Sequence, residues 1–232
     1  MSASIVQKFR PLIIAQTNTK CTGSVIFLHG SGDTGPGIRQ WLQSVLGEEF
    51  AFPHLRVIFP TAPPRPYSPM GGAVSTVWFD RDQISPFTAE TESLTTACKE
   101  VSHLIEAEVK NGIPKNRIVI GGFSMGGCLA LHLAYRFHKE IAGVFALSSF
   151  LQTESSVYKS IKEDGSSLVP LFQFHGKKDC LVMYEWGEDS FQKLKSLGVE
   201  GQFHTLSHLQ HELNRKEIEL LKQWIVEKVR NN

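Results

Sequence analysis

The segment Arg117-Ile118-Val119-Ile120-Gly121-Gly122-Phe123-Ser124-Met125-Gly126 carries the strongest structural signal in this chain. Its apolar, β-branched beginning predicts a short buried strand, and apolar residues at helical spacing from Gly127 to Phe137 predict a helix after it. Ser124 then stands on a sharp strand-to-helix turn, where glycines two positions away on each side remove side chains that would clash. This geometry predicts a nucleophilic serine whose hydroxyl points out over the sheet edge, although a serine here could also serve only as a helix cap.

Strand and helix patterns alternate along the rest of the chain. Apolar runs predict strands at 24–28, 55–59, 142–147, 169–174 and 202–206, and helical spacing predicts helices near 38–46, 94–109, 191–197 and 218–229. Continuous apolar strands with helices between them predict an α/β fold, with a mostly parallel sheet covered by helices on both faces. Together with the serine turn, this pattern is that of an α/β-hydrolase. We expect one domain over residues 1–232 and no large cap domain, since helix and strand follow closely after Ser124.

One stretch, from Pro60 to Phe87, departs from this alternation, because it holds five prolines within ten residues and shows no sustained period. A loop of this length in a compact domain usually has a binding role or hides an element. Its apolar members could line an acyl pocket or could simply pack over the sheet edge; they are Met70, Val74, Val77, Trp78 and Phe79.

Composition limits the classes of function. The formal net charge is +1 and the basic residues are scattered, so we expect no nucleic-acid partner. Neither a secretory signal nor a membrane-spanning apolar run is visible, which predicts a cytosolic protein with at most transient membrane contact. The four cysteines are far apart and lack metal-ligand spacing, so we expect free thiols, no metal and no cofactor, and assign no role to Cys128 or Cys180.

A serine nucleophile needs a histidine base, which in this fold follows the acid in the chain. We expect His132 and His138 on the surface of the helix after Ser124, and His175 and His204 are weak candidates because of their positions. The remaining two, His208 and His211, lie in the loop before the terminal helix.

The start of the terminal helix helps to separate these two histidines. Asn214 and Glu217 form a capping-box pattern, which predicts that the helix begins shortly after His211. This favours His211, the residue nearest the helix, and leaves His208 as the alternative.

The acid candidate is Asp179, which follows the strand ending at Phe174 through the turn at 175–178. A carboxylate at the carboxyl end of a parallel strand can reach an imidazole beside the serine turn. The alternative is an aspartate that only forms the turn.

The oxyanion formed during acyl transfer needs preorganised donors. We predict the backbone N–H of Met125, at the N-terminus of the helix, and that of Ser31, in the loop 29–33 after the first strand. We expect His29 and Asp33 to hold that loop in shape.

Four segments resemble the acyl-protein thioesterases and the related carboxylesterases and lysophospholipases. They are Leu28-His29-Gly30-Ser31-Gly32-Asp33-Thr34-Gly35, Ser75 to Asp80, Lys110 to Arg117, and His175-Gly176 through Asp179 with Leu181-Val182. The resemblance covers nearly the whole chain. It implies a Ser124–Asp179–His211 triad, with the base on His211, and acylated proteins or small acyl esters as substrates.

The chain departs from this family at two positions and in one loop. Met125 stands where the family often has Gln, and Cys180 where it often has Pro. The segment 67–74 differs in detail, so the family's chain-length preference is not carried over.

We therefore expect a serine hydrolase that removes acyl groups from thioesters through an acyl-enzyme, as in protein S-depalmitoylation. One alternative is a broad short-chain carboxylesterase with a shallow pocket. Another is an inactive hydrolase fold that binds acylated partners, against which the intact Ser, Asp and His candidates argue.

Overall fold

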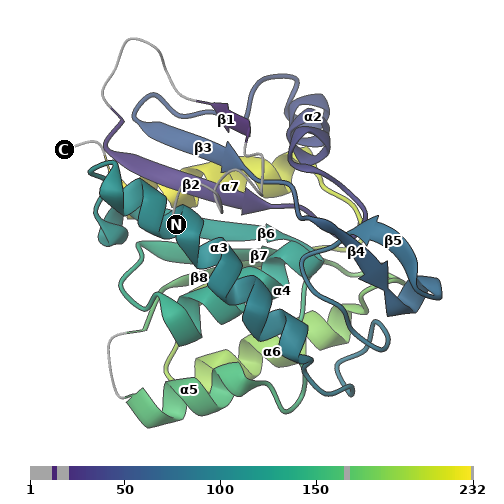
Figure 1. Ribbon diagram of the computed structural model, residues 1–232. Helices are drawn as coiled ribbons and strands as arrows, with labels where there is room; N and C mark the ends of the chain where they lie inside the picture. Colours follow the sequence, from purple (N-terminus) through teal and green to yellow (C-terminus); the bar gives the residue numbers. More distant parts are fainter. Residues whose placement is uncertain (1–11, 15–20, 165–167, 231–232) are drawn as a thin grey trace.

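A seven-stranded sheet in the order β1-β3-β2-β6-β7-β8-β9 runs through the centre of the computed structural model (Figure 1). The structure describes residues 12–14, 21–164 and 168–230. Six strands are parallel, and β1 pairs antiparallel with β3 at one edge. The strands are β1 (Leu12–Ile14), β2 (Gly23–Leu28), β3 (Leu55–Phe59), β6 (Ile118–Phe123), β7 (Gly143–Leu147), β8 (Leu171–Gly176) and β9 (Gly201–Leu206).

Helices cover both faces of this sheet (Figure 1). On one face lie α2 (Gly35–Leu46) and α7 (Arg215–Lys228), and on the other α3 (Glu92–Lys110), α4 (Met125–His132), α5 (Ser156–Asp164) and α6 (Tyr184–Ser196). Alternate strand residues point to opposite cores: Val25 and Phe27 pack toward α2 and α7, and Ile26 and Leu28 toward α3 and α4. The predicted α/β-hydrolase fold is confirmed, while α5 was not predicted.

Short helical turns complete these connections. A 3₁₀ turn, η2 (Lys115–Arg117), leads into β6, and a π-helical turn, η3 (Leu133–Phe137), extends α4. In the described part of the chain only helices and loops join β6, β7 and β8, so no large cap domain is inserted there. Within the same ranges, no helix is both long and apolar enough to cross a membrane.

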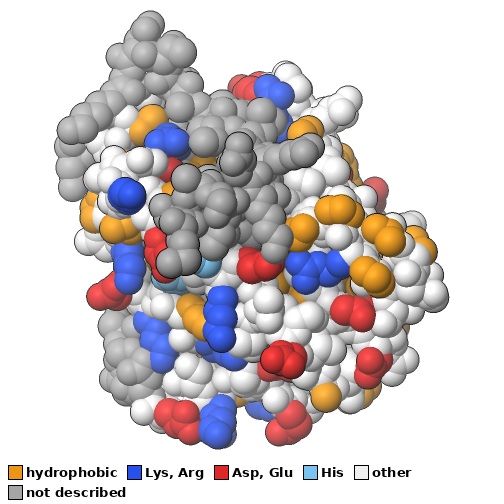
Figure 2. All heavy atoms as spheres, in the orientation of Figure 1, with side chains coloured by type: hydrophobic (Ala, Val, Ile, Leu, Met, Phe, Trp, Pro, Cys, Tyr) orange, Lys and Arg blue, Asp and Glu red, His pale blue; other side chains and the backbone are white. Residues whose placement is uncertain are grey.

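The Pro-rich stretch contains an antiparallel hairpin that the sequence did not predict. Its strands are β4 (Pro64–Tyr67) and β5 (Ala73–Thr76), joined by the 3₁₀ turn η1 (Ser68–Met70). Gly71 and Gly72, with φ of 64° and 83°, make the left-handed part of the turn. Figure 2 shows hydrophobic side chains gathered over this hairpin.

The residues just after the hairpin return to the core. Val77, Trp78 and Phe79 are at most 1% exposed and pack with α3 and α4. The indole Nε1 of Trp78 donates to the carbonyl oxygen of His29 over 2.8 Å, which ties this segment to the loop after β2.

Candidate active site

Ser124 occupies a strained turn between β6 and α4. Its φ of 53° and ψ of −119° lie outside the common regions for an L-residue, a conformation that costs about 1–3 kcal/mol and persists only where the surroundings enforce it. The surroundings here are tight, because a Cβ added at Gly122 or at Gly126 would lie 2.3 Å from the carbonyl oxygen of Leu28. Ser124 N–H also donates to Leu147 of β7 over 2.8 Å. The two glycines therefore allow the close packing that the sequence predicted.

The side chain of Asp179, at the turn after β8, is fully buried and ordered by hydrogen bonds. Its Oδ1 accepts from the N–H groups of Leu181 and Val182 at 3.0 and 2.8 Å, and its Oδ2 accepts from Nδ1 of His211 at 2.7 Å. Burial would raise its pKa, but the neighbouring N–H groups of His175 and His211 hold the pKa well below its usual range. Asp179 is thus a carboxylate aimed at an imidazole.

His211 lies in the loop between β9 and α7, and its position depends on where that helix begins. The predicted capping box is present: the Asn214 side chain accepts from Lys216 N–H, and Glu217 Oε2 accepts from Asn214 N–H at 3.1 Å. His208 lies in a separate surface depression that does not include Ser124. The structure therefore brings His211, and not His208, to Asp179.

Two aromatic rings support the imidazole. The ring of His211 packs 4.7 Å from that of Phe123, and Trp41 of α2 meets Phe123 edge-on at 5.2 Å. With a proton on Nδ1 donated to Asp179, Nε2 of His211 is left as an acceptor. Between the described side chains of Ser124 and His211 no hydrogen bond is formed, although both line one cleft.

That cleft has a volume of about 660 Å³. Its lining residues are Gly30, Ser31, Gly32, Asp33, Trp41, Met70, Ser75, Ile84, Phe123, Ser124, Leu181 and His211. Met70 and Leu181 are 56% and 51% exposed and form an apolar rim. Of the five predicted pocket residues, Met70 lines the cleft; Val74 is solvent-exposed, and for Val77, Trp78 and Phe79 the prediction is wrong, because they are buried in the core.

The loop after β2 lies against the serine turn. A Cβ at Gly30 would be 3.4 Å from Cβ of Ser124, and Ser31 Oγ is 3.6 Å from the thioether of Met125. The N–H groups of Gly32 and Asp33 already donate to the carbonyl oxygens of Thr76 and Gly30. The N–H group of Met125, the first residue of α4, has no acceptor within the helix.

His29 and Asp33 hold this loop in the way the sequence suggested. Nδ1 of His29 donates to Gly30 O at 2.7 Å, and its Nε2 accepts from Ala62 N–H at 3.0 Å. Burial lowers the pKa of His29, which favours this neutral form. Asp33 Oδ1 accepts from Thr34 N–H at 2.7 Å.

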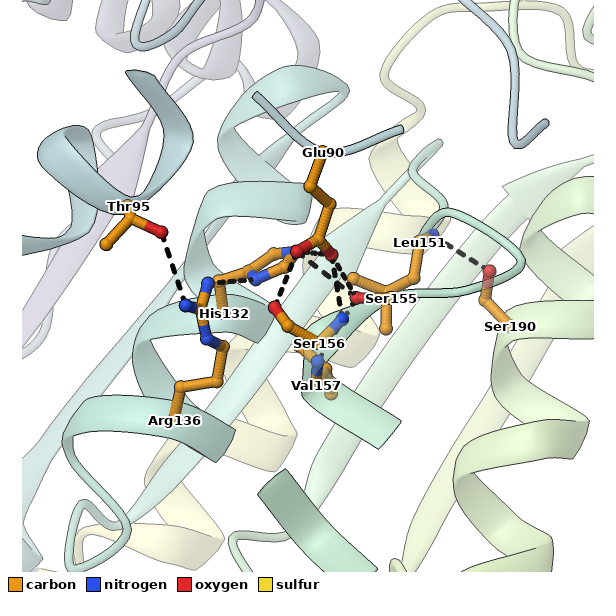
Figure 3. A network of polar contacts seen from close by, with 9 residues as sticks. All are labelled: Glu90, Thr95, His132, Arg136, Leu151, Ser155, Ser156, Val157 and Ser190. Carbon is orange, nitrogen blue, oxygen red and sulfur yellow. Dashed lines mark hydrogen bonds and ion pairs between the residues drawn. The ribbon is translucent and has the colours of Figure 1, made fainter. Parts of the chain in front are cut away.

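The prediction that His132 and His138 lie on a helix surface is wrong. His132 is fully buried, between Arg136, which donates to its Nδ1 at 3.0 Å, and Glu90, 3.4 Å from its Nε2 (Figure 3). His138 is 6% exposed and its Nε2 contacts Ser102 Oγ at 2.7 Å. Burial lowers the pKa of each imidazole to about 4, so both are neutral at pH 7.

Glu90 also joins separate segments of the chain. Its carboxylate accepts from both hydroxyls of Ser155 and Ser156 and from Ser156 N–H, at the start of α5 (Figure 3). This network is structural, because His132 and Ser155 are buried away from the cleft. Among the described residues, no group of His, Cys, Asp and Glu side chains is placed to hold a metal ion.

Comparison with known proteins places the chain in a family. The phospholipase/carboxylesterase family model matches residues 11–228. The chain is 51% identical over 217 residues to lysophospholipase-like protein 1 of Mus musculus, covering 93% of this chain and 91% of that protein. It is 33% identical over 223 residues to acyl-protein thioesterase 1 of Cryptococcus neoformans, covering 89% and 92%.

A solved structure agrees with these relatives. Acyl-protein thioesterase 2 of Zea mays superposes with a TM-score of 0.82 at 26% identity, covering 95% of this chain and 99% of that one. The resemblance seen in the sequence is thereby confirmed. The chain belongs to the phospholipase/carboxylesterase family of α/β-hydrolases and is a serine hydrolase.

Proposed function

We propose that this hydrolase cleaves acyl thioesters and esters, including S-acyl groups on proteins, with Ser124 as nucleophile, His211 as base and Asp179 as the orienting acid. The observation that carries the proposal is the 2.7 Å hydrogen bond to the buried carboxylate of Asp179 from His211, which lines the same cleft as the strained Ser124. A hydroxyl becomes a useful nucleophile only beside such an oriented base.

In the first step, Nε2 of His211 takes the proton of Ser124 Oγ as this oxygen attacks the acyl carbonyl carbon. The N–H groups of Ser31 and Met125 stabilise the oxyanion, and His211 then protonates the departing thiol or alcohol. The described side chains of Ser124 and His211 line one cleft without a hydrogen bond between them, and catalytic contacts of this kind commonly tighten when substrate binds.

In the second step, water attacks the acyl-Ser124 ester. His211 removes a proton from this water and returns it to Ser124 Oγ as the acid leaves. The chemistry therefore needs only side chains and amides that surround the cleft.

The substrate class follows from the cleft and from the relatives. Apolar surface for an acyl chain comes from Trp41, Met70, Ile84, Phe123 and Leu181, and the described residues that line the cleft include no Lys or Arg to bind a charged acyl group. Relatives named acyl-protein thioesterases support acylated proteins as substrates. We also propose the cytosol as compartment, since all four cysteines are unpaired, with transient contact to membranes that carry acylated proteins.

The test is a series of purified substrates: p-nitrophenyl esters from acetyl to palmitoyl, and a peptide with a palmitoyl thioester, each with wild type and Ser124→Ala. We expect wild type to release palmitate from the peptide and Ser124→Ala to release none. Rapid turnover of acetyl esters without palmitoyl release would favour the short-chain carboxylesterase. Binding of the palmitoyl peptide without turnover of any substrate would favour an inactive, acyl-binding fold.

A further inference from the structure

His175, near the end of β8, contacts the carboxylate of Asp179 and does not line the cleft. Its side chain is fully buried. Nε2 lies 2.8 Å from the carbonyl oxygen of Val182 and 3.4 Å from Oδ2 of Asp179. Both neighbouring oxygens can only accept, so Nε2 carries a proton, which it donates to Val182 O while lying close to Oδ2 of Asp179.

The surroundings of Nδ1 fix this tautomer. Among the described residues, Nδ1 of His175 is buried without a hydrogen-bond partner. It faces Gly187 of α6, where an added Cβ would lie 2.2 Å from Nδ1. A glycine inside a helix is unfavourable relative to alanine, and here it leaves room for the imidazole. The ring of Tyr184 closes the site edge-on at 6.1 Å.

Asp179 is consequently held from two sides. Two backbone N–H groups, of Leu181 and Val182, hold Oδ1, while Oδ2 faces the donor of His211 at 2.7 Å and that of His175 at 3.4 Å. The N–H groups of two imidazoles therefore lie near one carboxylate oxygen, and the shorter contact, from His211, is the hydrogen bond.

We propose that His175 is a positioning residue that tunes the base: its Nε2–H group, held by Val182 O and 3.4 Å from Oδ2, offsets part of the carboxylate charge that faces His211. Hydrolysis then persists to a lower pH than it would if the full carboxylate charge faced His211. This inference rests on the proposed triad.

The direction in which the pH–activity profile shifts distinguishes a residue that tunes the base from one that only supports the fold. Without the His175 donor, Oδ2 presents more negative charge to His211 and favours the imidazolium, so the acid limb of the pH–activity profile moves to higher pH. If His175 only supported the fold, its loss would loosen Asp179, weaken the bond to His211 and move that limb to lower pH. Leu181 and Val182 still anchor Oδ1, so we expect the upward shift.

Other titratable groups near these residues are the same in every variant. Asp33 lines the cleft opposite His211, Lys177 and Lys178 belong to the turn before Asp179, and His208 and Glu212 flank the His211 loop. Because they do not change, a difference between variants reports on position 175.

The experiment is the pH dependence of kcat/KM for p-nitrophenyl acetate, from pH 5 to 9, with His175→Leu and His175→Gln. Leucine removes the donor, and glutamine places an amide N–H near the position of Nε2. We expect His175→Leu to raise the acid-limb midpoint by about 0.5–1 pH unit, and His175→Gln to return it toward wild type. An unchanged or lowered midpoint in His175→Leu would overturn the inference.

The matched control is His204→Leu on the neighbouring strand. The ring of His204 lies 5.1 Å from that of Phe172 and its Nε2 contacts Gln202, so His204→Leu should leave the midpoint unchanged. Ser124→Ala is measured in parallel: residual hydrolysis there would overturn the triad, whereas its loss, with an unmoved His175→Leu midpoint, would overturn only the role of His175.

A second measurement does not require a folded variant. In wild-type protein with ¹⁵N-labelled histidine, the NMR spectrum should show His175 protonated at Nε2 and bare at Nδ1. The opposite tautomer would leave no N–H group on Nε2 beside Asp179 and would overturn the proposal.

Discussion

Replacing Asp179 by Asn tests the orienting role of the acid with almost no change in size. The two N–H donors of Leu181 and Val182 require an oxygen at the Oδ1 position. The amide oxygen of Asn takes that place, so its NH₂ group takes the place of Oδ2 and faces Nδ1 of His211. Two donors cannot bond to each other, so His211 must move its proton to Nε2, where it can no longer accept from Ser124.

The size of this effect follows from the loss of the base. A histidine held in the wrong tautomer lowers kcat by about 10³–10⁴-fold, which corresponds to about 4–5.5 kcal/mol in the activation barrier. The cleft lining is untouched, so KM should change little. The assay is kcat and KM for p-nitrophenyl acetate at pH 7.5, with circular dichroism to confirm folding.

The control for this test is a second Asp-to-Asn substitution, on the protein surface. Asp189→Asn, on α6 and outside the cleft, makes the same chemical change and should keep kcat within about twofold, as is usual for surface substitutions. If folded Asp179→Asn kept kcat within tenfold of wild type, the carboxylate would not be setting the tautomer, and the reasoning would be refuted.

Three further substitutions test stability and support of the site. Burial raises the pKa of Glu217 from 4.5 to about 8, so the folded protein holds a proton that the unfolded chain releases, and stability falls as pH rises between these values. Glu217→Gln keeps an acceptor for Asn214 N–H, and its advantage over wild type in urea unfolding should grow by up to about 5 kcal/mol from pH 4.5 to pH 8; an advantage independent of pH would contradict this. Gly126→Ala places a Cβ against Leu28 O, and should lower stability by more than about 1 kcal/mol in thermal melts and abolish hydrolysis; an active, equally stable variant would show that the turn has room. Phe123→Leu removes the ring that packs on His211, and should lower kcat about tenfold through misplacement of the base, whereas unchanged kcat would mean that Asp179 alone holds the imidazole.

The elements that the sequence predicted well have local causes. The turn at Ser124 is encoded by a β-branched run and by glycines whose absent side chains make room for Leu28 O. The start of α7 is encoded by the capping box of Asn214 and Glu217. Because parallel strands end at one edge of the sheet, these local signals were enough to predict that Asp179 and His211 lie together, as they do.

The elements that it missed depend on tertiary packing. α4 is buried on all sides, so His132 has no surface to occupy and finds Arg136 and Glu90 instead. The strands β4 and β5 have four residues each and contain prolines or exposed valine, too little for a period to show. The segment 77–79 is apolar whether it lines a pocket or fills the core, and only the fold distinguishes these cases.

His175 was missed as a partner of Asp179 for a similar reason. Its position before the acid in the chain made it a weak candidate for the base, and nothing in the sequence shows that its ring contacts the carboxylate. The one local trace is Gly187 inside α6, whose meaning depends on the contact with His175.

The central claim, that Ser124 is the nucleophile, is tested most directly by locating the covalent adduct of a fluorophosphonate probe. After labelling, the protein is digested and the modified peptide is sequenced by mass spectrometry, with Ser124→Ala treated in the same way. We expect a single adduct on Ser124 in wild type and no adduct in Ser124→Ala. An adduct on another residue, or undiminished labelling of Ser124→Ala, would contradict it.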